Sequence, residues 1–147
     1  MSLKERLLED LKQSMKNKDE IKKNTVQMVR SAVLQVEKDK RIVLDEDGII
    51  EVIAKEYKKR KDALPDYEKS GRQDLIDNLN KEIKIIEEYL PEQLSYEEVE
   101  VFVKEAITKT NASSMKDMRN VMAEVMPKVK GRADGKMINE ITKKYLQ

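Results

Sequence analysis

The chain has 147 residues, of which 40% are charged and 39% hydrophobic, with only 4 glycines and 3 prolines. It has no cysteine and no histidine, which excludes disulfides, thiol chemistry, thiolate metal sites and imidazole acid–base catalysis. The net charge of +1 neither drives nor forbids nucleic-acid binding, so such a function needs a local basic patch.

Apolar residues at helical spacing predict two helices in the first forty residues. The first covers about residues 2–17, with an apolar stripe of Leu3, Leu7, Leu8, Leu11 and Met15. Asp19 is a candidate N-cap for the second, because its carboxylate can accept hydrogen bonds from the first free amides. The buried stripe expected for this second helix is Ile21, Thr25, Met28, Val29, Ala32, Val33 and Val36.

A third helix is predicted after Asp45, with Ile49, Ile50, Val52, Ile53 and Tyr57 on its buried side. Pro65 is expected to kink this helix or end it early, since proline removes a hydrogen bond and clashes with the preceding turn. Gly71 is the expected C-terminal stop. Residues 58–61 form a basic cluster on this helix that is bracketed by acidic residues, which favours a solvated face.

The next helix, at about residues 72–90, carries a heptad-like seam of Ile76, Leu79, Ile83, Ile86 and Leu90. The seam is too short for a long coiled coil, so this is interpreted as a connecting helix packed on its neighbours. Pro91 closes it.

Three helices are predicted beyond Pro91. Ser95 and Glu98 have the spacing of a capping box that begins the first of them. Pro127 and Gly131 are expected to interrupt the chain before the last helix. Five of the eight methionines lie in this region, at Met115, Met118, Met122, Met126 and Met137.

These patterns predict an all-α protein with seven helices and no strand. The best domain boundary lies at Pro91 to Leu94. It divides the chain into residues 1–92, which include the long connecting helix, and residues 93–147, a basic three-helix tail domain. The amphipathic N-terminus lacks the apolar core of a signal peptide, and no stretch approaches the roughly 20 apolar residues of a membrane span. We therefore expect a soluble cytoplasmic protein without membrane contact.

The charge is unevenly spread along the chain. Residues 111–147 contain eight Lys and Arg against four Asp and Glu, a net of +4, and the other 110 residues carry −3. A near-neutral chain thus has a distinctly basic C-terminal segment.

The segment KVKGRADGK, residues 128–136, has two possible interpretations. As a junction between helices, it uses Gly131 to end one helix and Asp134 to cap the next. This leaves its four cations without a role, and Lys136 in a first helical turn opposes the helix dipole. Exposed amides with the cations Lys128, Lys130 and Arg132 would suit a phosphate group, so both interpretations stay open.

The methionine set also has two interpretations: the core between two small helices, or a surface that accepts several partners. No Walker loop, dinucleotide fingerprint or nucleophile with an activating base is present. Adjacent carboxylates on helices point in different directions, which argues against a metal site. We therefore predict no catalytic residue, no metal and no cofactor.

Three blocks, SGRQDL (70–75), EYLPEQLSYEEV (88–99) and VMPKVKGRADGKMIN (125–139), resemble in the same order the YqeY family. This family is similar to the tail domain of GatB, a subunit of glutamine-dependent aspartyl/glutamyl-tRNA amidotransferase. The resemblance implies two small helical domains joined by a long, partly helical linker. It also implies contact with tRNA or another structured RNA. The candidate RNA-contacting residues carried over are Lys128, Lys130, Gly131, Arg132, Asp134, Gly135 and Lys136.

The basic charge of residues 111–147 makes Lys116 and Arg119 secondary basic candidates. By the resemblance, Gly71, Arg72 and Asp74 match a turn with a structural role. The family usually has Met-Gly where this chain has Met118–Arg119, which puts in doubt any contact that needs bare backbone there.

The function expected from the sequence is a non-catalytic tRNA- or RNA-binding module. A carbon–nitrogen ligase label with glutamine as amido-N-donor would be inherited through the shared domain, because this chain lacks the kinase, glutaminase and transamidation sites. The alternative is a protein-interaction adaptor that uses the Met-rich helices, with a tRNA-modifying protein as partner.

Overall fold

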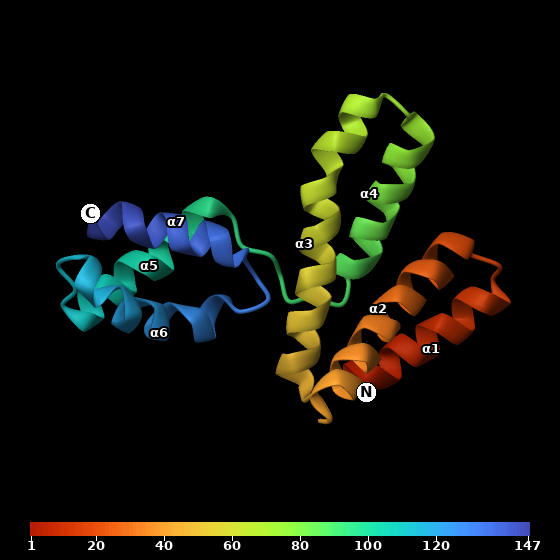
Figure 1. Cartoon of the computed structure of the whole chain (residues 1–147), viewed down its shortest axis with the longest axis horizontal. Coiled ribbons are helices and arrows are strands. Elements are labelled where there is room, and N and C mark those ends of the chain that lie inside the picture. The colour runs from red at the N-terminus through yellow and green to blue at the C-terminus, as the bar shows by residue number, and fades with distance from the viewer. The chain divides into compact units, whose positions relative to one another are not determined.

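The computed structural model describes all residues from 1 to 147, and it contains seven α helices and no strand (Figure 1). The predicted all-α class and the number of helices are therefore confirmed. The chain divides into two compact units, residues 1–90 and 91–147, each with its own hydrophobic core. None of the helices combines the length and apolar character that a membrane span requires.

In the first unit, α1 packs mainly on α2, α2 also packs on α3 and α4, and α3 packs on α4. Figure 1 shows α1 and α2 side by side, and likewise α3 and α4. The bounds are α1 Leu3–Lys16, α2 Glu20–Lys40, α3 Glu46–Ser70 and α4 Gln73–Glu87. The predicted connecting helix, α4, packs inside this unit on α2 and α3.

Local capping explains where these helices begin and end. The side chains of Ser2, Asp19 and Asp45 each accept a hydrogen bond from a backbone N–H in the first turn of the following helix. At the end of α3, Gly71 adopts a left-handed φ of 69°, as a glycine C-cap can without strain. The two predicted aspartate caps and the glycine stop are confirmed.

The first core is built from one face of each helix. Its fully buried side chains include Leu7, Val26, Val29, Val33, Ile49, Ile53 and Ile86. Met28 was expected in this core but is 52% exposed, and Val26 is buried instead. Consecutive helical residues are about 100° apart around the axis, so burial of Val29 turns Met28 toward the helix flank.

Two features of α3 differ from expectation. The helix does not end early at Pro65 but continues to Ser70, and Pro65 lies on an exposed face where water can bind the unpaired carbonyl one turn earlier. In the basic cluster of residues 58–61, Arg60 is only 7% exposed instead of solvated. Its Nη1 donates to the Glu56 carbonyl at 3.0 Å, and its Nε lies 3.9 Å from a Glu82 carboxylate oxygen.

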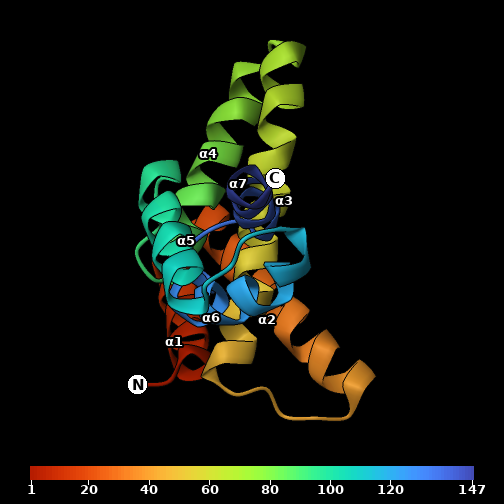
Figure 2. The ribbon, with the colours of Figure 1, turned by 90° about the vertical axis from the view of Figure 1, so that its left-hand side faces the viewer.

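The second unit contains three helices of similar length, α5 Tyr96–Thr110, α6 Met118–Val129 and α7 Gly135–Leu146 (Figure 2). A single 3₁₀ turn, Met115–Asp117, precedes α6. The capping box of Ser95 and Glu98 at the start of α5 is confirmed. The core consists of Val99, Val103, Ala106, Val121, Val125, Val129, Ile138, Ile141 and Leu146.

Two expectations for this region need correction. Pro127 does not interrupt α6, which continues to Val129 because the proline lies in its exposed last turn. The three-helix tail is also less basic than expected, since residues 91–147 hold ten Lys and Arg against nine Asp and Glu. Helix α5 itself carries four glutamates against Lys104 and Lys109, so the net positive charge comes from residues 111–147.

Candidate nucleic-acid interface

The loop between α6 and α7 is a tight turn held by several hydrogen bonds. After α6 ends at Val129, Gly131 takes a left-handed φ of 73°, and the Arg132 amide donates to the Val129 carbonyl at 2.8 Å. Asp134 caps α7, since its carboxylate accepts from the Lys136 amide at 3.1 Å. The structural roles expected for Gly131 and Asp134 are confirmed.

A second segment, residues 91–94, holds this loop in place. The Leu94 amide donates to the Arg132 carbonyl at 2.8 Å, and the Gln93 Nε2 donates to the Gly131 carbonyl at 2.9 Å. In return, the Arg132 Nε donates to the Glu92 carbonyl at 3.1 Å. Three hydrogen bonds therefore join the segment to the loop: two are accepted by loop carbonyls, and one is donated by the Arg132 side chain to the Glu92 carbonyl.

Sequence reasoning missed Gln93 as a supporting residue. Its segment lies in the resembling block of residues 88–99, but about forty residues separate it from the loop. Nothing local indicates that its side chain reaches the Gly131 carbonyl. The only signal was the joint occurrence of the two blocks in one chain.

The four cations of the loop have different surroundings. Lys128, Lys130 and Lys136 are exposed, whereas Arg132 is half-buried. The Arg132 guanidinium also donates from Nη1 to the Lys128 carbonyl at 3.3 Å, so two of its donors are already engaged. The structure thus offers three lysines to solvent and uses the arginine within the loop.

Gly135 is the first residue of α7, and the space around its Cα is open. A Cβ atom placed there would meet no heavy atom within 4 Å, and the φ of Gly135 is not in the left-handed region. Neither packing nor backbone conformation inside the protein therefore requires glycine at this position. Because Gly135 has no side chain, the backbone at the start of α7 is accessible next to Lys136.

The start of α7 is only partly available to an anion. The Asp134 carboxylate already accepts from one of its amides and places a negative charge at the helix terminus. This aspartate is exposed, so solvent weakens its repulsion of a phosphate. Exposed lysines beside the loop, and not the helix amides alone, would have to supply the attraction.

The secondary candidates Lys116 and Arg119 do not lie with the loop. They are exposed at the N-terminal end of α6, whereas the loop follows its C-terminal end. Eleven residues of helix correspond to roughly 16 Å. The basic residues therefore form two separate groups at the two ends of α6. The turn residues are elsewhere again, in the first unit, where Arg72 pairs with Asp74 at 3.8 Å.

A polar cluster that the sequence did not indicate joins α5 to α7. The Tyr145 hydroxyl donates to the Glu100 carboxylate, and the Lys144 Nζ lies 3.5 Å from the same carboxylate. Lys144 also lies over the rings of Tyr96 and Tyr145, at 5.7 and 5.4 Å from their centroids. The hydrogen bond from Tyr145, with the charge of Lys144, lowers the pKa of Glu100.

The methionines are mainly core residues. Met118, Met122, Met126 and Met137 are half-buried and pack against the core of the second unit, whereas Met115 is 39% exposed. The core interpretation of this set is confirmed. No group of three or more His, Cys, Asp or Glu side chains is placed to hold a metal ion.

Comparison with known proteins identifies a family and several sequence relatives. The family model described as "Yqey-like protein" matches residues 4–146. The chain is 33% identical over 120 residues to a Vanderwaltozyma polyspora protein named "Altered inheritance of mitochondria protein 41, mitochondrial" (76% of this chain, 64% of that protein). It is 37% identical over 111 residues to the Kluyveromyces lactis protein of the same name (73% and 60%). The identity to the Pyrenophora tritici-repentis protein of that name is 23% over 130 residues (87% and 71%).

These matches correct the expected cellular location, and they cover only part of the relatives' length. The first two relatives are named as mitochondrial proteins, which contradicts the cytoplasmic location expected from the sequence. The expectation failed because the composition of a water-exposed helical protein does not distinguish one aqueous compartment from another. The chain also spans only about 60% of the length of these two relatives. The family match nevertheless covers nearly the whole chain, and this chain belongs to the YqeY-like protein family.

Proposed function

We propose that the protein is a non-catalytic RNA-binding module whose loop at residues 128–136 contacts the phosphate backbone. The observation that carries this proposal is the hydrogen-bonded loop, whose Gly131 and Arg132 carbonyls are held by residues 93–94 and whose Lys128, Lys130 and Lys136 are exposed. A rigid support lowers the entropy lost when a charged surface binds. Lysine ammonium groups act as point charges on phosphates and carry no base specificity.

A structured RNA is the preferred ligand, and tRNA is the first candidate. The support for tRNA is the resemblance of the loop and of residues 88–99 to the amidotransferase tail domain, whose matching region helps hold tRNA. Binding through a few lysines would be of moderate affinity and would read shape more than sequence. The bare start of α7 at Gly135 would allow the sugar–phosphate backbone to approach closely.

Arg132 is proposed to act as a positioning residue. Its Nε and Nη1 donors bind the carbonyls of Glu92 and Lys128. It would therefore set the shape of the loop, and the three lysines would supply the phosphate contacts. We further propose that the two units, residues 1–90 and 91–147, act as two domains, as the family resemblance implies.

The test is a salt series of tRNA binding by fluorescence anisotropy with the full-length protein. Lys128→Ala and Lys136→Ala should each weaken binding and lower the slope of log Kd against log salt by about 1. Lys81→Ala is the matched control, because Lys81 is an exposed lysine in the first unit and should change neither value. Affinity and slope equal to wild type in both loop variants would refute the proposal.

Arg132→Ala separates positioning from phosphate contact. It should weaken tRNA binding and also lower the midpoint of thermal unfolding, since loop hydrogen bonds are lost. Lys128→Ala should leave this midpoint close to wild type, because exposed surface substitutions usually change stability by less than about 0.5 kcal/mol. Weaker binding by Arg132→Ala without any loss of stability would instead indicate direct phosphate contact.

A further inference from the structure

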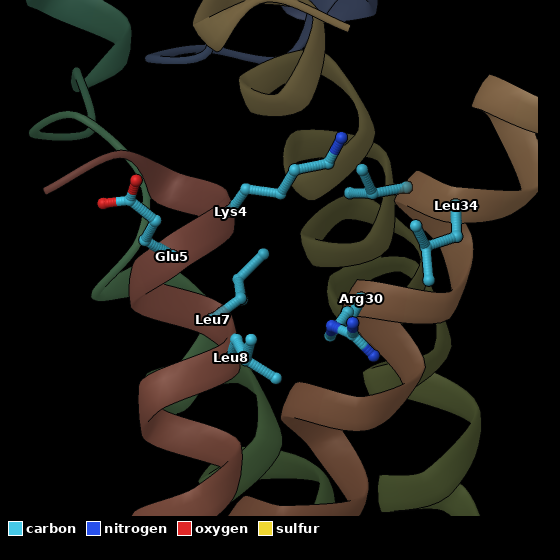
Figure 3. Close-up of a pocket in the computed structure, with 7 residues that line it drawn as sticks. Lys4, Glu5, Leu7, Leu8, Arg30 and Leu34 are labelled. Atoms are coloured by element: carbon cyan, nitrogen blue, oxygen red, sulfur yellow. The ribbon is translucent and has the colours of Figure 1, made fainter. Parts of the chain in front are cut away.

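The surface of the first unit has a small apolar groove between α1 and α2 (Figure 3). Its volume is about 210 Å³. Leu7 and Val33 form a fully buried floor, and Leu8 and Leu34 form walls that stay 37% and 42% exposed. Figure 3 shows Lys4, Leu7 and Leu8 extending from α1 toward α2, with Arg30 and Leu34 on the α2 side.

The size and lining of the groove limit what it can hold. Small-molecule sites usually enclose about 300–1,000 Å³ and carry several convergent polar groups, so this groove is too small and too apolar for a cofactor. It is suited to one or two aliphatic side chains. Apolar anchors at i, i+3 and i+7 of an amphipathic helix enter grooves between helices in this way.

The charges around the groove favour an acidic occupant. Two of the charged residues that line it are engaged within the protein: the Lys4 Nζ lies 2.7 Å from Glu37, and the Glu5 carboxylate accepts from the Ser2 amide at 3.3 Å. Arg30 is half-buried and makes no hydrogen bond or ion pair. A cation at the edge of an apolar groove gains most from a carboxylate brought by the occupant.

We propose that this groove binds an amphipathic helix of a partner protein, with leucine-like anchors between Leu8 and Leu34 and a carboxylate on Arg30. A second copy of the chain is the alternative occupant. A twofold interface repeats one surface on both sides, and the only lining carboxylate that a second copy would bring is Glu5, which caps α1 through the Ser2 amide. The groove lies in the first unit, residues 1–90. This inference is therefore independent of the RNA binding proposed for the second unit, residues 91–147.

The probe is a fluorescein-labelled, stapled helical peptide with leucine at i, i+3 and i+7 and glutamate on both flanks. Its affinity for the full-length protein should fall at least about tenfold in Arg30→Glu. A peptide with lysine in place of glutamate should bind the Arg30→Glu variant more tightly than the wild-type protein by a similar factor, because peptide and protein then again carry opposite charges. Leu8→Gln and Leu34→Gln should weaken binding of the acidic peptide to the wild-type protein and of the lysine peptide to the Arg30→Glu variant.

Val43→Gln is the control variant, because Val43 is 83% exposed and does not line the groove. Circular dichroism would verify that every variant folds. The proposal is overturned if the acidic peptide fails to bind at about 1 mM, or if Arg30→Glu leaves its affinity unchanged. It is also overturned if Leu8→Gln abolishes self-association in light scattering, or abolishes sedimentation with phosphatidylserine vesicles, since a second copy or a membrane would then be the occupant.

Discussion

Arg132 and Gly135 lie three residues apart in the same loop, yet the protein uses them in different ways. Arg132 is half-buried, and its guanidinium bonds two carbonyl groups of the surrounding backbone. Gly135 has no neighbour that would clash with a side chain. Arg132 therefore stabilises the loop through its hydrogen bonds, whereas no packing contact or backbone conformation in the protein requires glycine at position 135.

Gly135→Ala should separate stability from function. Alanine is free of steric conflict at this position and loses less backbone entropy on folding, so the free energy of unfolding should rise by about 0.4–1 kcal/mol. If the bare backbone admits a phosphate, tRNA affinity should fall in the same variant. Urea unfolding and anisotropy measure the two effects. Unchanged tRNA affinity would exclude Gly135 from the interface.

Arg60 shows at the residue scale why charge patterns alone mislead. It lies in a run of basic residues, yet the core between α2, α3 and α4 encloses it. Its Nη2 contacts the Met28 sulfur at 3.7 Å, and its Nε makes no hydrogen bond. Removal of one partner from a buried ion pair typically costs about 3–5 kcal/mol, because the other charge is left without compensation.

Arg60→Ala should destabilise the first unit by at most about 3–5 kcal/mol, since Glu56 would remain largely buried with only the exposed Lys59, 3.6 Å away, to offset its charge. The double variant Arg60→Met/Glu56→Gln should recover much of this loss, because it removes both charges together. Urea unfolding followed by circular dichroism measures the difference. A loss below about 0.5 kcal/mol in Arg60→Ala, the range of ordinary surface changes, would contradict a stabilising role.

At the scale of elements, α5 and α7 are joined by polar contacts as well as by apolar packing. Glu100 of α5 accepts from the Tyr145 hydroxyl and pairs with Lys144, both on α7. The same contacts raise the pKa of Lys144, chiefly through the nearby Tyr96 and Glu100. This cluster fixes how one helix crosses the other at a position that hydrophobic periodicity does not specify.

The cluster makes stability depend on acid pH. The pKa of Glu100 is lower in the folded protein than in the unfolded chain, chiefly because of the Tyr145 hydroxyl. Its contribution is therefore present above the unfolded value of about 4.3 and is lost as pH falls through the folded value. Tyr145→Phe should flatten this acid loss in thermal unfolding measured from neutral to acid pH.

Tyr67→Phe provides the control for that experiment, since Tyr67 is an exposed tyrosine in the first unit. It should reproduce the wild-type pH profile. An acid loss of stability in Tyr145→Phe as steep as in wild type would show that Glu100 does not couple the helices in this way.

At the scale of the whole molecule, the chain has two separate hydrophobic cores. The core of residues 1–90 centres on leucine, isoleucine and valine from α1 to α4, and that of residues 91–147 on valine and isoleucine from α5 to α7. No buried residue of one core belongs to the other. Such an arrangement commonly unfolds in more than one step.

Residues 91–147 expressed alone should therefore fold, with helical circular dichroism and a cooperative thermal transition. A chain this short is marginal, so its midpoint should lie below that of most larger domains. Heteronuclear NMR would show dispersed amide signals if the core forms. A random-coil spectrum would show that the unit needs residues 1–90 to fold.

Much of the fold could be predicted because its signals are local. Helical periodicity and the caps at Asp19, Asp45, Ser95 and Asp134 act within three or four residues, so the sequence contains both partners of each interaction. At Pro65 and Pro127 the helix continues past an exposed proline, to Ser70 and to Val129, so the local breaking signal did not decide where either helix ends. The sequence also located the loop and its capping residues.

What the sequence by itself determined was therefore the helical class, the order of the helices and most of their ends. Only the tertiary structure decided which charged groups are available to a ligand. Arg132 is engaged by Glu92 across forty residues, and Arg60 is enclosed by helices that lie up to 32 residues away. Burial and hydrogen bonding of a long side chain depend on such distant neighbours, and no local pattern of charge records them.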